Sequence, residues 1–177
     1  IDQIKVKGEN KMLQLIHRIL WFLVLVLVQV LVLNHVHIAG YATPVLYIYY
    51  ILTLNSETTR VSLLLQGFFL GLCVDVFSNT PGVNAAACTL LAFVRPALLR
   101  MQMVRDITDD YEPGIRIMGF SPFLRYVTSG TFLMVLVWQL IDIFSLFRIE
   151  ELFWRVLSST FLSVILIMCI DAVRRKR

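Results

Sequence analysis

The sequence predicts an all-α integral membrane protein, a compact bundle of six transmembrane helices, with five as the alternative count. Hydrophobic residues make up 58% of the 177-residue chain, and its mean hydropathy is +0.78. Charged residues make up only 16%, against about 25% in ordinary soluble domains. A soluble domain of this size could not bury so much apolar surface around one core. Most of the outer surface is therefore expected to face lipid.

Six apolar runs give the count, since a spanning helix needs roughly 20 mostly apolar residues. They cover residues 19–38, 41–54, 61–78, 83–103, 121–147 and 152–173. The longest polar stretch after the first residues, 105–116, separates the fourth run from the fifth. Ser121 as N-cap and Pro122 in the first turn predict where the fifth helix begins.

The second run is too short for an ordinary span. At ~1.5 Å per residue, a helix over residues 41–54 covers about 21 Å of a hydrocarbon core about 30 Å thick. Flanking residues, a tilt in a thinned bilayer or a re-entrant path would each accommodate it. We expect it to span, because otherwise one end of the chain would have to lie outside.

The first eleven residues are polar and aperiodic, and the membrane pattern starts just after Met12. Residues 1–11 are either a non-native or flexible extension before a natural start at Met12, or a short cytoplasmic tail. Residues 12–177 are expected to form a single transmembrane helical domain.

The positive charges predict the orientation of the spans. With six spans and both ends inside, thirteen Lys and Arg residues lie on the cytoplasmic side and two on the outer side. The inner set is Lys5, Lys7, Lys11, Arg18, Arg60, Arg100, Arg105, Arg116, Arg125 and residues 174–177, and the outer set is Arg148 and Arg155. This bias places both termini in the cytoplasm.

One carboxylate lies inside the third run. Gly67, Gly71 and Asp75 recur every four residues, so they share one helix face, and the polar turn of Ser78, Asn79, Pro81 and Gly82 follows.

An ionisable group at this depth requires a partner, a water-filled cavity or a proton. Asp75, Asp142 and Arg155 fall at a similar depth, roughly 6–8 Å below the outer interface. We therefore expect an intramembrane polar cluster in which Arg155 pairs with a carboxylate; the alternative is that each charge reaches the headgroups by itself.

Arg95 lies in the fourth run, about one-third of the way in from the cytoplasmic side, with no carboxylate at its level. We expect its side chain to extend to the inner headgroups, with a buried site as the alternative, and Pro96 to end or kink the helix. A stripe of small residues, Ala85, Thr89, Ala92 and Pro96, runs along the same helix. With Gly67 and Gly71 it predicts either a tightly packed hairpin or a packing surface for a partner helix.

Other chemistry is not indicated. Cys73, Cys88 and Cys169 lie in apolar runs without CxxC spacing, and His35 and His37 are two residues apart, which separates them around a helix. Common catalytic motifs such as GxSxG, HExxH and the Walker loop are missing. We therefore expect neither an enzyme nor a cofactor, metal or nucleic-acid site.

The hairpin resembles a known family. The run Gly67-Phe-Phe-Leu-Gly-Leu-Cys-Val-Asp75-Val-Phe-Ser-Asn-Thr-Pro-Gly82, followed by Ala85-Ala-Ala and Phe93-Val-Arg-Pro96, is similar to the signature hairpin of the rod shape-determining protein MreD family. The stretch from Leu31 to Tyr41 is similar to one branch of it. The resemblance covers residues 12–177; it is specific in the hairpin and loose in the last two runs.

That resemblance implies a multi-pass protein of the bacterial cytoplasmic membrane, with a fold similar to the substrate-binding subunits of energy-coupling-factor transporters. It implies a non-catalytic scaffold without a cofactor. The partners would be a bitopic MreC-like protein and the elongation machinery of MreB filaments, a SEDS-family polymerase and its transpeptidase. The runner-up function is a substrate-binding subunit of a small-molecule transporter, and an intramembrane enzyme comes third.

Overall fold

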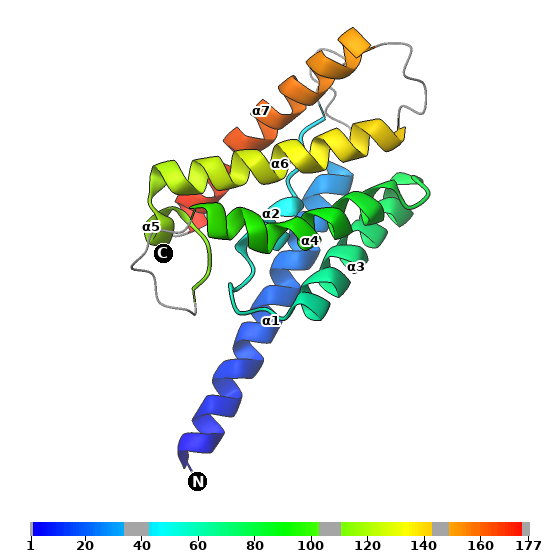
Figure 1. The fold of residues 1–177 in the computed structure, drawn as a ribbon. Helices are drawn as coiled ribbons and strands as arrows, with labels where there is room; N and C mark the ends of the chain where they lie inside the picture. Colours follow the sequence, from blue (N-terminus) through cyan, green and yellow to red (C-terminus); the bar gives the residue numbers. More distant parts are fainter. Residues whose placement is uncertain (1, 34–42, 103–110, 143–148, 175–177) are drawn as a thin grey trace.

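The computed structural model describes residues 2–33, 43–102, 111–142 and 149–174, and all regular secondary structure in these ranges is helical. Its elements are α1 (Asp2–Leu31), α2 (Ile48–Thr53), α3 (Arg60–Ser78), α4 (Val83–Gln102), α5 (Ile115–Met118), α6 (Phe120–Asp142) and α7 (Ile149–Arg174), as Figure 1 shows.

Four described helices are long and apolar enough to cross a membrane: α3, α4, α6 and the Leu152–Arg174 part of α7. Between a third and a half of each apolar window is buried inside the bundle, so large apolar side chains point outward on every one of them. α1 contributes a shorter apolar helical stretch, Arg18–Leu31. The four apolar helices fit the predicted third to sixth runs.

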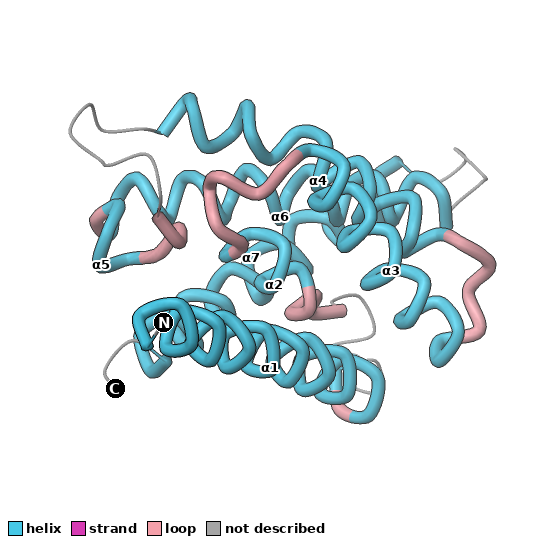
Figure 2. The backbone as a smooth tube through the Cα atoms, turned by 90° about the horizontal axis from the view of Figure 1, so that it is seen from below, coloured by secondary structure: helices cyan, strands magenta, loops and turns pink. Residues whose placement is uncertain are grey.

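The short helix α2 lies at the centre of the bundle and contacts α1, α3, α4 and α6 (Figures 1 and 2). Its side chains are almost completely enclosed, and Ile48, Ile51 and Leu52 have no exposed surface. Viewed from below, α1 passes along one side of α2, and α3 and α4 lie on other sides (Figure 2). The second apolar run is therefore the core around which the longer helices pack.

The continuous helix expected over residues 41–54 is wrong. Only Ile48–Thr53 is helical; residues 43–46 are irregular, and 41–42 lie outside the described ranges. Pro44 accounts for part of this, because it cannot donate a helical hydrogen bond and disfavours helix in the residue before it. Non-helical chain reaches up to about 3.3 Å per residue, so the run extends further than a helix of equal length.

At the other runs the differences are smaller. α1 is helical from Asp2 onward, so there is no break at Met12; which residue starts the natural protein stays a prediction. Pro96 lies inside α4 without ending it. α6 begins at Phe120, one residue before the predicted Ser121. Gly119, with φ 83°, interrupts the helical conformation between α5 and α6. His35 and His37 lie outside the described residues.

α3 and α4 form a closely packed antiparallel hairpin, the most extensive helix contact in the bundle. A Cβ added at Gly71 would lie 2.5 Å from the Cα of Ala85 and 2.6 Å from its N atom, and one added at Gly67 would lie 2.9 Å from the Cβ of Ala92. Only a hydrogen atom fits at these positions. The alternative in which the small residues close the hairpin on itself is confirmed.

Gly71→Ala is expected to destabilise the protein by several kcal/mol, since a methyl group would collide with backbone that cannot move without separating the helices. Gly130→Ala is the matched control: its Cβ would meet the flexible end of Leu52 at 3.0 Å, so we expect a loss of about 1 kcal/mol or less. Thermal unfolding of the two purified variants in detergent compares them. Equal melting temperatures would contradict the close hairpin contact.

Candidate functional site

Asp75 is buried at the end of α3, and its carboxylate receives four hydrogen bonds from the start of α4 and the turn before it. Oδ1 accepts from the Thr80 hydroxyl at 2.6 Å, the Asn84 amide N–H at 3.0 Å and the Asn84 side-chain amide at 2.9 Å. Oδ2 accepts from the Ala85 N–H at 2.8 Å. The first N–H groups of a helix have no partner within the helix, so a carboxylate there is stabilised without a cation.

The polar turn creates this arrangement. α3 ends at Ser78, Asn79 takes the left-handed conformation with φ 53°, and Gly82 has φ 79°. At Gly82 this conformation is one that an L side chain rarely adopts, and the Gly82 carbonyl accepts the N–H of Ala86. The chain thereby reverses within four residues, Pro81 among them, and directs the start of α4 at Asp75.

The predicted ion pair between Asp75 and Arg155 is wrong. Both oxygens of Asp75 bind residues 80–85, and the ion pair found among the described side chains, Arg18 with Glu112, lies elsewhere. The side chain of Asp142 lies outside the described residues, so its place in the predicted cluster stays a prediction. Arg155 lies near the start of α7 and is partly exposed.

The Asp75 site connects to the centre of the bundle. The hydroxyl of Tyr47, just before α2, donates to the Oδ1 of Asn84 at 2.7 Å. Asn84 therefore both donates to Asp75 and accepts from Tyr47, which settles the orientation of its amide. Three parts of the chain, the end of α3, the start of α4 and the start of α2, meet in one buried polar network.

A second network satisfies the irregular backbone before α2. The Gln29 side chain of α1 donates to the carbonyl of Pro44 at 2.9 Å and accepts from the N–H of Leu46 at 2.8 Å. From α7, the Ser163 hydroxyl accepts the N–H of Val45 at 2.8 Å, and Ser159 accepts the N–H of Thr43 at 3.2 Å. Non-helical backbone inside an apolar bundle needs such partners, since an unpaired polar group there costs several kcal/mol.

Arg95 binds backbone groups at the other, C-terminal end of α2. The residue is 1% exposed. Its guanidinium donates to the carbonyls of Leu52 and Leu54 and, at 3.2 Å, to the hydroxyl of Tyr126, which itself donates to the Leu52 carbonyl. Helix C-termini carry unpaired carbonyls and a partial negative charge, so a cation is favourable there. The expectation that Arg95 extends to the headgroups is wrong.

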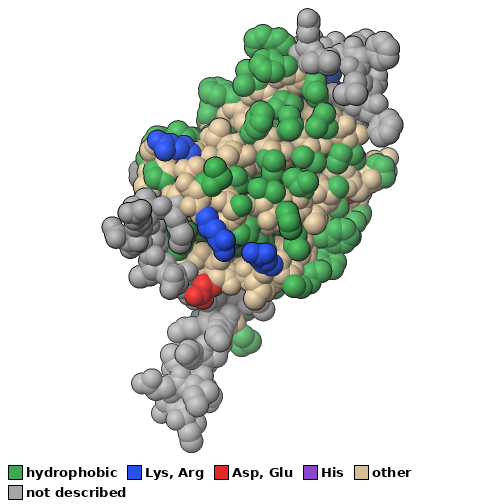
Figure 3. Space-filling model, viewed as in Figure 1, with side chains coloured by type: hydrophobic (Ala, Val, Ile, Leu, Met, Phe, Trp, Pro, Cys, Tyr) green, Lys and Arg blue, Asp and Glu red, His purple; other side chains and the backbone are tan. Residues whose placement is uncertain are grey.

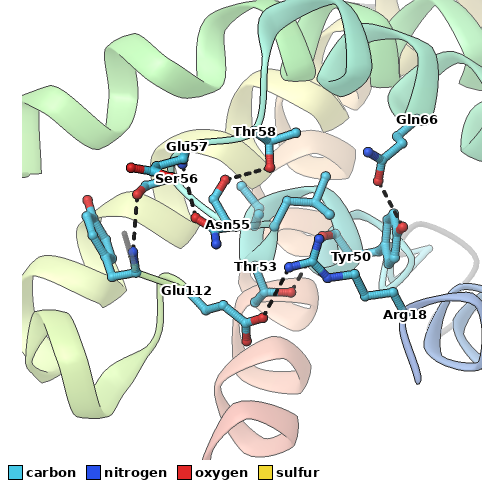
Figure 4. Close-up of polar contacts among 12 residues, drawn as sticks. Arg18, Tyr50, Thr53, Asn55, Ser56, Glu57, Thr58, Gln66 and Glu112 are labelled. Atoms are coloured by element: carbon cyan, nitrogen blue, oxygen red, sulfur yellow. Dashed lines mark hydrogen bonds and ion pairs between the residues drawn. The ribbon is translucent and has the colours of Figure 1, made fainter. Parts of the chain in front are cut away.

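Further polar contacts, here called the polar rim, lie around the C-terminal end of α2. Arg18 of α1 reaches Glu112 at 3.7 Å, and the hydroxyl of Tyr50 donates to Gln66 of α3 at 2.9 Å (Figure 4). The loop before α3 pairs with the segment before α5, because the N–H of Ser56 donates to the carbonyl of Tyr111. Burial raises the pKa of Tyr111, while the charge of Arg95 opposes that rise.

The end of α7 is attached to the same rim. Asp171 accepts from the hydroxyl of Tyr49 at 2.9 Å and from the N–H of Ile115 at 3.0 Å. The guanidinium of Arg174 lies over the ring of Trp21, 4.8 Å from its centroid. Such a cation–π contact adds about 1 kcal/mol. The last helix is thus held against α1, α2 and α5 by side chains from its final turn.

The predicted partner-helix surface is occupied within the chain. Gly67, Gly71, Ala85 and Ala92 are buried between α3 and α4, and the Thr89 hydroxyl donates to the Ala85 carbonyl of its own helix. A foreign helix has no access to this face, so its assignment as a partner surface is wrong.

Sequence reasoning missed Gln29, Ser159, Ser163, Tyr126 and Asp171. Each is a polar residue within an apolar helix, and that signal was available. What it could not give was the partner, which lies more than 100 residues away for both serines. Among the described residues the cysteines are free, and no cluster of three His, Cys, Asp or Glu side chains could hold a metal ion.

These features define a class: a multi-pass α-helical membrane protein with a buried, irregular central segment. Comparisons with protein-family models, with curated proteins and with solved structures found no match.

Removing the Asp75 carboxylate should affect the same network as removing Asn84. We expect Asp75→Leu and Asn84→Ala to be non-additive by at least about 1 kcal/mol, because each leaves the other's buried group unpaired. Asp75→Leu and Arg155→Leu should add to within about 0.5 kcal/mol. A double-mutant cycle of unfolding free energies measures both. Strong coupling to Arg155 would contradict the hydrogen-bond arrangement.

Arg95→Leu is expected to lower the unfolding free energy by about 2–4 kcal/mol, since the carbonyls at the end of α2 lose their donors. Arg95→Lys should not restore it, because an ammonium group cannot reproduce the planar guanidinium contacts. Arg100→Leu, on the exposed side of the same helix, is the control and should change stability by less than about 0.5 kcal/mol. Denaturant titration in micelles distinguishes them; comparable losses at both arginines would refute the structural role of Arg95.

Proposed function

We propose that this chain is a non-catalytic membrane scaffold of the bacterial cell-elongation machinery, which binds an MreC-like bitopic protein and helps couple MreB filaments to peptidoglycan synthesis. The observation that carries the proposal is the Asp75 hairpin. The residues that resemble the MreD signature, Gly67, Gly71, Asp75 and the turn to Gly82, are the ones that hold α3 and α4 together. A family signature explained by structural contacts fits a scaffold.

The buried polar groups support a role without catalysis. Asp75, Arg95, Gln29 and Ser163 are each bound to backbone groups or to other side chains of the bundle. A catalytic acid or base must be able to reach a substrate atom. Groups whose hydrogen-bonding capacity is used to hold the fold do not meet that requirement.

The partner helix needs an outer face, since the Gly67–Gly71 face is filled. We assign it to α7, where Phe153, Leu157 and Phe161 recur every four residues and are 62%, 48% and 68% exposed, with Trp154 beside them. Aromatic residues are enriched at positions that dominate binding energy. In lipid such an interface forms by close packing, because no hydrophobic driving force acts between helices there.

The orientation belongs to the same proposal. Both termini lie in the cytoplasm, and residues 43–54 cross the membrane as irregular chain followed by α2, enclosed by the other helices. Irregular backbone at membrane depth is tolerated where protein covers it. Arg60, Arg100 and Arg125 then face the cytoplasm, as the positive-inside rule requires.

A substrate-binding transporter subunit is the second candidate, and the irregular segment before α2 favours it. Transporters commonly bind substrates at broken membrane helices, using the backbone groups that the break frees. Here Gln29, Ser159 and Ser163 already engage the groups of residues 43–46. The scaffold is therefore the better-supported function.

Affinity purification of the full chain from native membranes tests the function. We expect an MreC-like bitopic protein and MreB to co-purify. Recovery of an ATPase module instead would favour the transporter, and recovery of neither would count against the scaffold.

The docking face is tested with paired substitutions. Leu157→Ala with Phe161→Ala should reduce recovery of the MreC-like partner about tenfold or more, because truncating buried anchors costs at least about 1–2 kcal/mol. Leu23→Ala with Leu27→Ala on α1 is the matched control, since both residues are also about half exposed. Equal recovery with both pairs would move the interface away from α7.

A further inference from the structure

A groove of about 460 Å³ opens on the surface of the bundle between the start of α3 and the last turns of α4. Its walls are mainly apolar, and its lining includes Leu63, Ala92, Phe93, Pro96, Arg60 and Arg100. The groove reaches Ala92, which packs against Gly67 in the closed hairpin contact. It is therefore a surface that the bundle leaves open after the two helices have packed.

The hollow has a simple cause in the sequence. Toward α3, the last turns of α4 present Ala92, Pro96 and Ala97, whose side chains are small or compact. Opposite them α3 presents Leu63 and Leu64. The large ring of Phe93 is 72% exposed and points outward, so it borders the groove without filling it.

The charges lie at one end of the groove. Because α3 and α4 are antiparallel, the first residue of α3 and the last turn of α4 lie at the same end of the hairpin, and Arg60 and Arg100 are both exposed there. Figure 3 shows basic side chains toward the lower edge of a face with many exposed hydrophobic side chains; an acidic side chain lies below them, and a further basic one lies higher on the left. Among the described residues, neither arginine forms an ion pair and no carboxylate lines the groove.

The apolar part of the groove is long enough to hold a stretch of an acyl chain. From Arg100 to Ala92 the groove follows α4 for eight residues, which is about 12 Å at ~1.5 Å per residue. An occupant complementary to this surface carries negative charge at one end and hydrocarbon along the rest. Phospholipids with an anionic headgroup have that chemistry, and basic pockets between membrane helices bind such headgroups.

We propose that this groove binds an anionic phospholipid, with the headgroup phosphate between Arg60 and Arg100 and one acyl chain along Leu63, Ala92 and Pro96. Guanidinium groups suit the phosphate because they bind its oxygens through two parallel hydrogen bonds. The proposal requires only membrane insertion, so it holds or fails independently of the elongation role. Under this proposal the hairpin of α3 and α4 prefers anionic lipid, a property that the packing of the bundle does not by itself require.

Native mass spectrometry of the full chain in detergent provides the test, with added dioleoyl phosphatidylglycerol as probe and dioleoyl phosphatidylcholine as the neutral comparison. We expect the anionic lipid to be retained at least about tenfold better. Arg60→Gln with Arg100→Gln should remove that preference, since both positive charges that attract the anionic headgroup are then absent. Arg125→Gln removes an exposed arginine on α6, outside the groove, and should leave the preference unchanged.

A second variant separates the groove from its charges. Ala97→Trp fills the groove with both arginines in place and should lower phosphatidylglycerol retention about tenfold, while gel-filtration elution and melting temperature confirm a folded protein. Several results would overturn the proposal: equal retention of both lipids, loss with Arg125→Gln, or no loss with Ala97→Trp. Competition by inorganic phosphate alone would assign the arginines to a free anion. A co-purifying protein released by Ala97→Trp would assign the groove to a partner helix.

Discussion

The fold depends on one constraint: the backbone of residues 43–54 lies inside an apolar bundle without forming a continuous helix, and its polar groups must still be paired. Gln29 from α1 and Ser163 from α7 supply partners at its start, and Arg95 from α4 supplies them at its end. These side chains can reach only if their helices surround α2. The arrangement of the long helices therefore follows from the requirement that the backbone groups around the short helix be paired.

Two of the buried charged residues, Asp75 and Arg95, are stabilised by the same physical means, with opposite sign. Asp75 accepts hydrogen bonds from the first N–H groups of α4, and Arg95 donates to the last carbonyls of α2. Both use the unpaired groups that every helix leaves at its ends. Each charge therefore gains a partner, and the helix terminus gains a cap, without an oppositely charged side chain. This explains why pairing charges by depth led to the wrong partner for Asp75.

The polar groups inside the bundle hold α2 in place, so we place the binding surfaces on the outside of the bundle. The aromatic face of α7 and the groove between α3 and α4 are different surfaces: one consists of exposed side chains on a single helix, and the other is a hollow between two helices with two arginines at one end. A bundle of this kind can contact a protein partner and a lipid at the same time. That division suits a scaffold, in which rigidity inside supports binding outside.

The sequence by itself determined the membrane class, the extents of α3, α4, α6 and most of α7 to within a few residues in the described ranges, and the hairpin turn with its buried Asp75. Those features depend on composition, on helical periodicity and on turn residues, which are local properties. Only the tertiary structure decided that α2 is a short central helix, that Arg95 is buried and that the glycine face is filled by α4. These outcomes depend on which residues meet across the bundle, over separations of more than 100 positions, and no local pattern encodes that choice.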